Sequence, residues 1–118
     1  DLLPLLLATS DGTLDKHHAT WKQGAALSVV MAAKGYPNEY QKGTIINGLD
    51  QDFGAGVEVF HAGTAMMGAQ LVSHGGRVLN VTATGDSVKA AQAAAYAAVD
   101  TIDFADGFYR RDIGWRAL

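Results

Sequence analysis

The sequence predicts an α+β fold with a mainly antiparallel sheet, and three observations support this. Apolar or alternating runs typical of strands lie between residues 25 and 83. One long helical stretch follows them, at about residues 87–102. Strands that come first and are then followed by a helix, without regular alternation, are typical of α+β domains. The length of 118 residues suits one domain with one hydrophobic core.

The N-terminal residues predict a short helix over residues 2–9, because their apolar positions recur at helical spacing. Pro4 fits there only within a first turn. Residues 10–13 predict a turn, and a second short helical or irregular piece is expected at residues 14–17. The chain starts at Asp1 directly in an apolar run, so we expect it to be a piece of a longer polypeptide.

Three strands are predicted before residue 62. Residues 25–33 are apolar at nearly every position, which predicts a strand covered on both faces of its sheet. Shorter strands are predicted at residues 44–47 and 57–61, the second from its alternation of polar and apolar side chains. Glycine-containing loops are expected at residues 34–38 and 48–56.

A tight antiparallel hairpin is predicted at Gly75-Gly76. Residues 70–73 and 77–83 are both extended runs, and they flank the sequence His74-Gly-Gly-Arg77. Two glycines between two such runs are a strong hairpin signal. His74 and Arg77 would then face each other across the turn.

The helix over residues 87–102 is the clearest element of the sequence. Asp86 or Ser87, after Gly85, supplies its N-cap. Its apolar stripe is formed by Val88, Ala91, Ala95, Val99 and Ile102. Because alanine is frequent along it, the helix can lie close against a sheet, and residues 103–107 end it.

Composition excludes several classes of function. The net charge of −3 argues against nucleic acid or an anionic membrane as a partner, so any anion site must be local. The absence of cysteine excludes disulfides, thiolate zinc sites and a cysteine nucleophile, and it fits a cytoplasmic protein. No apolar run approaches the roughly 20 residues that span a bilayer.

Arg77 is the leading candidate for a functional residue. It is expected where a turn meets a strand, and its planar cation can bind a phosphate with two hydrogen bonds. The alternative is a solvated arginine at the edge of a hairpin. Asn80 is expected on the opposite face of the strand, because side chains alternate, unless the strand bends or twists sharply. A buried, hydrogen-bonded role is therefore predicted for Asn80.

His61 and Gly63 form a second candidate. A histidine followed by a glycine that lets a ligand approach the backbone suits substrate contact, although a histidine that ends a strand is more often an ordinary hydrogen-bonded residue. His17 and His18 are adjacent, so they diverge and make no metal pair. The sequence shows no metal-ligand spacing, no nucleotide-binding loop and no catalytic constellation.

The last eleven residues are rich in arginine and aromatic side chains. Arg110, Arg111 and Arg116 can form a salt-bridged clasp with Asp112, or they can help to bind an anion. The clasp is preferred for a terminal segment, with Tyr109 and Trp115 packing as anchors.

Three motifs carry a resemblance to a known family. They are Val59-Phe-His-Ala-Gly-Thr64, Gly75-Gly-Arg-Val-Leu-Asn-Val-Thr-Ala83 and Phe108-Tyr-Arg-Arg-Asp-Ile-Gly-Trp-Arg-Ala-Leu118. In this order they resemble the C-terminal end of the phosphoribosylamine–glycine ligases, which are ATP-grasp enzymes of purine biosynthesis. The similarity extends over nearly the whole chain.

The resemblance implies an ATP- and magnesium-dependent ligation of 5-phosphoribosylamine to glycine. Residues 1–20 would end the ATP-grasp domain, and residues 21–118 would form the C-terminal domain that closes one wall of the substrate site. Arg77 would contact the ribose phosphate, and the stretch around His61 and Gly63 would line the same wall.

The family's ATP and magnesium ligands precede the part that this chain resembles. We therefore expect these 118 residues neither to bind ATP tightly nor to catalyse, and we expect the missing N-terminal and ATP-grasp domains to be partners. Two alternatives remain: the C-terminal domain of another ATP-grasp ligase or carboxylase, and a domain that only packs against missing lobes through Leu2, Leu5 and Leu6.

Overall fold

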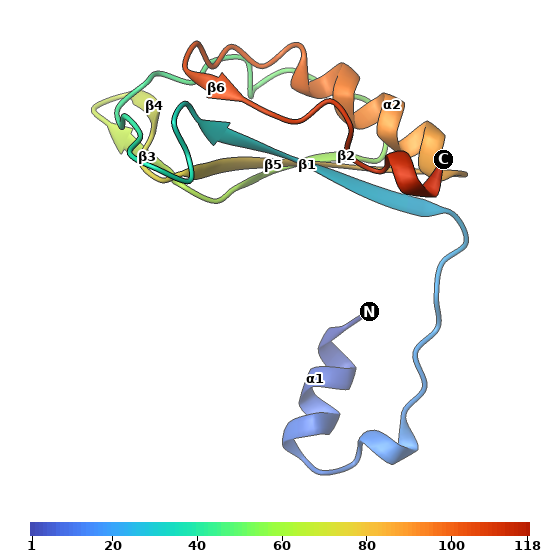
Figure 1. Cartoon of the computed structure of the whole chain (residues 1–118). Coiled ribbons are helices and arrows are strands. Elements are labelled where there is room, and N and C mark those ends of the chain that lie inside the picture. The colour runs from blue at the N-terminus through green and yellow to red at the C-terminus, as the bar shows by residue number, and fades with distance from the viewer.

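The computed structural model describes all 118 residues, from Asp1 to Leu118. Its main body is a four-stranded antiparallel sheet in the order β2-β5-β1-β6, which confirms the α+β class (Figure 1). The strands of this sheet are β1 (Ala25–Ala33), β2 (Val57–His61), β5 (Arg77–Gly85) and β6 (Gly107–Phe108).

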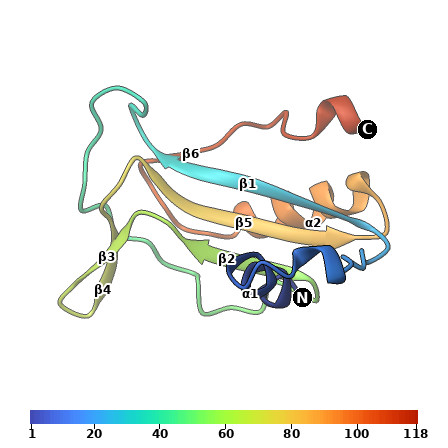
Figure 2. The same cartoon turned by 90° about the horizontal axis from the view of Figure 1, so that it is seen from below.

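A second sheet consists of two strands only, β3 (Thr64–Met67) and β4 (Gln70–Ser73), which pair antiparallel. This hairpin extends from the end of the main sheet beyond β2 (Figure 2). The hairpin that the sequence predicted at Gly75-Gly76 is therefore wrong, because β4 pairs with β3 while β5 pairs with β1 and β2. His74 and Arg77 do not face each other across a turn.

Gly63 and Gly75 lie where two segments of the chain cross in close contact. Neither Gly75 nor Gly76 has the positive φ that a two-residue hairpin turn requires. The N–H groups of His74 and Gly75 both donate to the carbonyl oxygen of Gly63, at 2.8 and 3.0 Å. A Cβ on Gly63 would lie 2.5 Å from the carbonyl oxygen of Arg77. Residue 63 therefore has no room for a side chain, because the backbone of Arg77 and Gly75 lies where the Cβ would be.

Helix α2 (Val88–Val99) covers one face of the main sheet (Figure 1). Ser87 caps it, as predicted, and its Oγ accepts from the N–H of Ala90 at 3.2 Å. The helix ends three residues before the expected Ile102, in a tighter turn in which the Ile102 N–H donates to the carbonyl of Val99. The core lies between helix and sheet, and its largest fully buried side chains include Leu79, Val29, Val78, Val81 and Val99.

The other face of the main sheet is largely open. In β1, Val29 and Met31 are buried under α2, whereas Ala26 and Ser28 on the opposite face are exposed. The expectation that this strand is covered on both faces is wrong over its first half, because only one helix packs on the sheet. The strand predicted at residues 44–47 is also wrong, since that segment forms only isolated bridges.

The N-terminal arm lies apart from the sheet, on its open side (Figure 1). It contains helix α1 (Leu3–Ser10) and a 3₁₀ turn, η1 (Leu14–Lys16), both as predicted. No hydrogen bond joins residues 1–17 to the residues after them. The Cα radius of gyration is 17.0 Å, against about 13–14 Å for a compact chain of this length. Neither α-helix has the length and apolar character needed to cross a bilayer.

Candidate functional site

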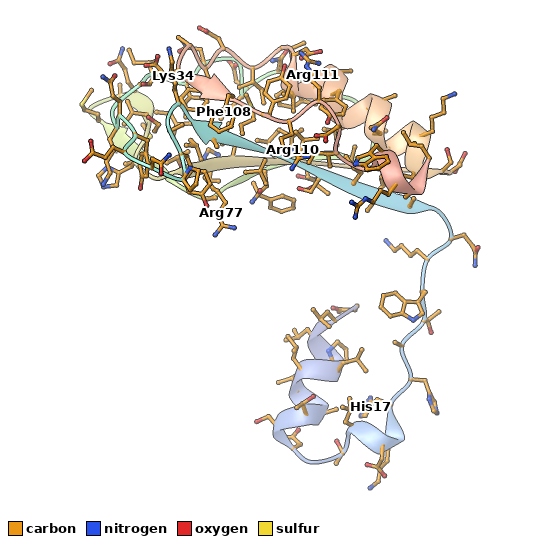
Figure 3. The ribbon with its side chains drawn as sticks, viewed as in Figure 1. His17, Lys34, Arg77, Phe108, Arg110 and Arg111 are labelled. Atoms are coloured by element: carbon orange, nitrogen blue, oxygen red, sulfur yellow. The ribbon has the colours of Figure 1, made fainter.

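A hollow lies at one end of the main sheet, beside the crossing of the two glycine-containing segments. Its volume is ≈ 510 Å³, and it is lined by Tyr36, Ala62, Gly63, Gly75, Gly76, Arg77 and Asn80. Arg77 points away from the face that carries α2 (Figure 3). Because Arg77 is the single charged residue among those that line it, the hollow has a local positive charge suited to an anion.

Arg77 and Asn80 lie on the same face of β5, which corrects the expectation of opposite faces. Ala32 pairs with Arg77, and the next residue of β1, Met31, pairs with Leu79. Val78 is therefore an extra residue in β5, a β-bulge. The bulge reverses the alternation of side chains at this point. This irregularity of the strand allows Arg77 and Asn80 to share one face.

The guanidinium of Arg77 has no partner within the chain. The two salt bridges of the structure join Arg110 to Asp112 and Arg111 to Asp100, and no side-chain hydrogen bond involves Arg77. Beside it, Gly76 is buried, yet its N–H makes no hydrogen bond within the chain. Buried backbone donors are nearly always paired. An anion in the hollow would supply an acceptor for both groups.

The structure brings Gly63, but not His61, to this hollow. His61 pairs with Leu79, whose side chain lies in the core, so its imidazole is on the face opposite Arg77. The Nδ1 of His61 lies 3.0 Å from the Oγ1 of Thr64, at the corner that leads into β3.

The expectation of a buried, hydrogen-bonded Asn80 is wrong. Its side chain is half-buried, and no hydrogen bond of the structure involves it. Together with Tyr36, Asn80 is a residue of the hollow that sequence reasoning did not assign to it. The signal that could have revealed Tyr36 is Gly76, because a Cβ on Gly76 would overlap the Tyr36 ring.

The C-terminal segment is held as a clasp. Arg110 pairs with Asp112, as expected, but the contact with the end of α2 is made by Arg111 and Asp100. Arg111 binds both carboxylate oxygens of Asp100, at 2.7 and 3.0 Å, and the hydroxyl of Tyr109 donates to the same carboxylate. The Arg111 guanidinium and the Tyr109 hydroxyl lower the pKa of Asp100 below its ordinary value. Burial and the neighbouring Asp100 carboxylate raise the pKa of Tyr109.

Two residues of α2 also hold this segment. Tyr96 donates to the carbonyl of Arg110 at 2.6 Å, and Gln92 donates to the carbonyl of Ile113 at 2.6 Å. Trp115 is 58% exposed, so the expectation that it packs as an anchor is wrong. The guanidinium of Arg116 instead lies 5.1 Å from the centre of its ring.

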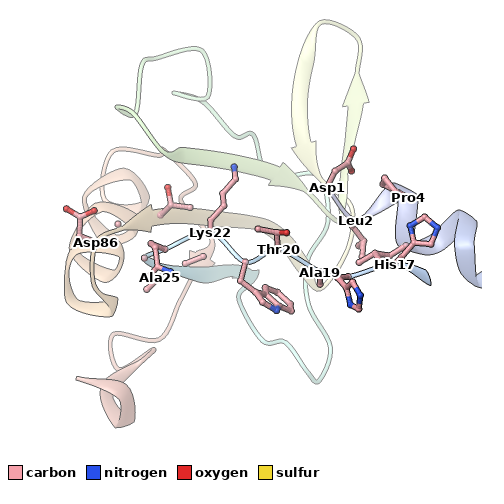
Figure 4. A pocket seen from close by; sticks show the side chains of 17 residues that line it. Asp1, Leu2, Pro4, His17, Ala19, Thr20, Lys22, Ala25 and Asp86 are labelled. Carbon is pink, nitrogen blue, oxygen red and sulfur yellow. The ribbon is translucent and has the colours of Figure 1, made fainter. Parts of the chain in front are cut away.

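A second cavity, of ≈ 820 Å³, lies where α1 and the extended residues 17–24 approach the ends of β1 and β5 (Figure 4). His17 and His18 line it, but no group of three His, Asp or Glu side chains is placed to hold a metal ion. The residues that line this cavity therefore do not fit a magnesium–nucleotide site.

Comparison with known proteins shows the family to which most of the chain belongs. Residues 26–116 match the family of phosphoribosylglycinamide synthetase C domains. The chain is 58% identical over 118 residues to the phosphoribosylamine–glycine ligase of Mesorhizobium japonicum and 49% identical over 119 residues to that of Escherichia coli. Each alignment covers 100% of this chain and 28% of the relative.

A solved structure agrees with these sequence matches. The crystal structure of the phosphoribosylamine–glycine ligase of Thermotoga maritima superposes with a TM-score of 0.83 at 34% identity, covering 95% of this chain and 27% of that protein. The chain thus spans somewhat more than a quarter of the length of its relatives. With most of its residues matched and the fold shared, the chain belongs to the phosphoribosylglycinamide synthetase C-domain family.

Proposed function

We propose that this chain is the C-terminal part of an ATP- and magnesium-dependent ligase that joins 5-phosphoribosylamine to glycine, giving glycinamide ribonucleotide, in the cytoplasm. The support is its identity of 58% to a phosphoribosylamine–glycine ligase over the full chain. ATP, magnesium and the activation of glycine belong, in this proposal, to the rest of the enzyme. The 118 residues alone are then inactive.

The role proposed for this domain is to bind the phosphate of phosphoribosylamine. The observation that carries this proposal is the unpaired guanidinium of Arg77 in a hollow without a carboxylate. The N–H of Gly76 is a second donor beside it. A phosphate monoester can accept both hydrogen bonds, and a hydrogen bond to a charged group contributes about 1.5–3 kcal/mol.

Gly63 and His61 take different parts in this wall. Gly63 lines the hollow, and its lack of a side chain lets β5 pass close by. His61 lies outside the hollow, so we propose that it supports the wall through its hydrogen bond to Thr64. It would contact substrate only through a segment that reaches over that corner.

We further propose that residues 1–20 end the ATP-grasp domain and that residues 21–118 form the substrate-wall domain. Leu3, Leu6 and Leu7 of α1 are each more than half exposed, which is costly for a helix with nothing packed against it. In the intact ligase, the rest of the ATP-grasp domain would cover them.

Steady-state kinetics of the intact ligase test the proposal. Arg77→Ala should raise the KM for phosphoribosylamine by about 10- to 100-fold, from the loss of one charged hydrogen-bonded contact. The KM values for ATP and glycine should stay within about twofold. Lys89→Ala is the matched control, because Lys89 is an exposed cation on α2, away from the hollow. An unchanged KM for phosphoribosylamine in Arg77→Ala would contradict the assignment.

A further inference from the structure

Asn80 sits in an apolar row on the open face of the sheet. Its direct neighbours across the strands are Phe60 on β2 and Val30 on β1. Neither side chain can hydrogen-bond to an amide. The Asn80 amide is half-buried and makes no hydrogen bond within the chain, yet its polar atoms are not cut off from solvent. It is therefore free to bond to a ligand that enters the hollow.

The next row of the same face shows how the fold satisfies polar groups elsewhere. There Thr82 lies opposite Ser28, and its Oγ1 donates to the Ser28 Oγ at 2.8 Å. Both rows cross β2, β5 and β1, but the second has Glu58 on β2 where the first has Phe60. The lack of a partner is thus a property of Asn80 and not of the whole face.

The bulge sets the spacing between Asn80 and Arg77. Their partners on β1, Val30 and Ala32, are two residues apart, which corresponds to about 7 Å along a strand. Both residues line the hollow, and Tyr36 forms one of its sides. An anion held by Arg77 would therefore lie near the Asn80 amide, which is neutral and can both donate and accept a hydrogen bond.

We propose that Asn80 contacts a hydroxyl of the sugar whose phosphate Arg77 binds, so that the hollow selects a ribose phosphate over phosphate alone. The inference rests on the proposed phosphate-binding role of Arg77. A carboxamide both donates and accepts, which matches a hydroxyl. A site built to bond a hydroxyl discriminates against ligands that lack one, because its own polar group is then unpaired.

Chemical-shift titrations of the 118-residue chain with ribose 5-phosphate and with inorganic phosphate test this inference. In the wild type, the side-chain amide resonances of Asn80 should shift with ribose 5-phosphate and stay in place with phosphate. In Asn80→Ala, the preference for ribose 5-phosphate over phosphate should fall about three- to tenfold, as for one hydrogen bond between neutral groups. The Kd for phosphate should not change.

Thr82→Val is the control, because it removes a hydroxyl from the same strand face outside the hollow. It should leave both Kd values unchanged. An unaltered preference in Asn80→Ala, or Asn80 resonances that respond equally to both ligands, overturns the role of Asn80 while leaving Arg77 as a phosphate site. If Arg77→Ala leaves the Kd for phosphate unchanged, or if the wild type binds neither ligand, the proposed phosphate site fails and this inference fails with it.

Discussion

Arg77 and Asn80 are three residues apart in β5 and still lie on one face of the sheet, because Val78 is an extra residue opposite β1. In a regular strand this spacing would place the two side chains on opposite faces. The bulge is held by the carbonyl of Val78, which accepts from the N–H groups of both Ala62 and Gly63. The crossing at Gly63 and the arrangement of the hollow are thus parts of one structure.

Gly63→Ala should destabilise the domain by about 1–3 kcal/mol, as overpacking of a tight contact does. The new Cβ would meet the carbonyl oxygen of Arg77 at 2.5 Å, so the segment around Gly63 and the start of β5 would have to separate. Chemical denaturation measures the free energy of unfolding. Gly68→Ala is the comparison, because Gly68 has open space around it. The only expected cost there is that of placing alanine at a φ of +62°, which is about 1 kcal/mol. A Gly63→Ala protein more stable than Gly68→Ala would contradict the crossing.

Ser87→Ala should lower the free energy of unfolding by about 1 kcal/mol, because the N–H of Ala90 loses its acceptor. Ser87→Gly should cost only a few tenths of a kcal/mol, since glycine lets water reach that N–H. Thermal or urea unfolding of the two variants measures the difference. Equal losses would indicate that the cap contributes little to the stability of this domain.

Asp100 should make stability depend on acid pH. Its folded pKa is lowered by Arg111 and Tyr109, so its contribution is present above the unfolded pKa, near 3.8, and is lost as pH falls through the folded pKa. The decline therefore lies below about pH 5. Asp100→Asn should flatten the acid limb of stability against pH while lowering stability at pH 7. Asp11→Asn, at an exposed aspartate outside this cluster, should leave the limb unchanged.

The exposed leucines of α1 should cause the isolated chain to self-associate. Leu3, Leu6 and Leu7 of α1, and Leu2 directly before it, are 56–65% exposed, and exposed apolar patches promote association. Sedimentation equilibrium should show a mass that rises with concentration, and the double substitution Leu3→Glu with Leu7→Glu should abolish the rise. A constant monomer mass for the wild type would argue that the helix needs no partner.

Local patterns in the sequence predicted the elements that depend on local forces. The bounds of β1 and β2, the two N-terminal helical pieces and the cap at Ser87 all follow from apolar spacing or from a single hydroxyl. The strand expected at residues 44–47 failed because a short apolar run carries too little information about its pairing.

The errors near the site have one physical origin. Glycine permits both a positive φ and a close backbone approach, and the sequence does not distinguish the two uses. The sequence therefore favours a turn at Gly75 and Gly76, whereas in the structure Gly75 lies against Gly63 and Gly76 lies against the Tyr36 ring. The bulge at Val78 depends on pairing with β1, which is 45 residues earlier in the chain, so the shared face of Arg77 and Asn80 could not be predicted locally.

The most direct measurement follows the Nε–H resonances of the arginines during a titration with inorganic phosphate. If Arg77 is the anion-binding group of the hollow, its Nε–H and the backbone N–H of Gly76 should shift together, saturably and with one Kd. The resonances of Arg110, Arg111 and Arg116 should remain in place. Shifts confined to those three tail arginines, with Arg77 unmoved, would contradict the account.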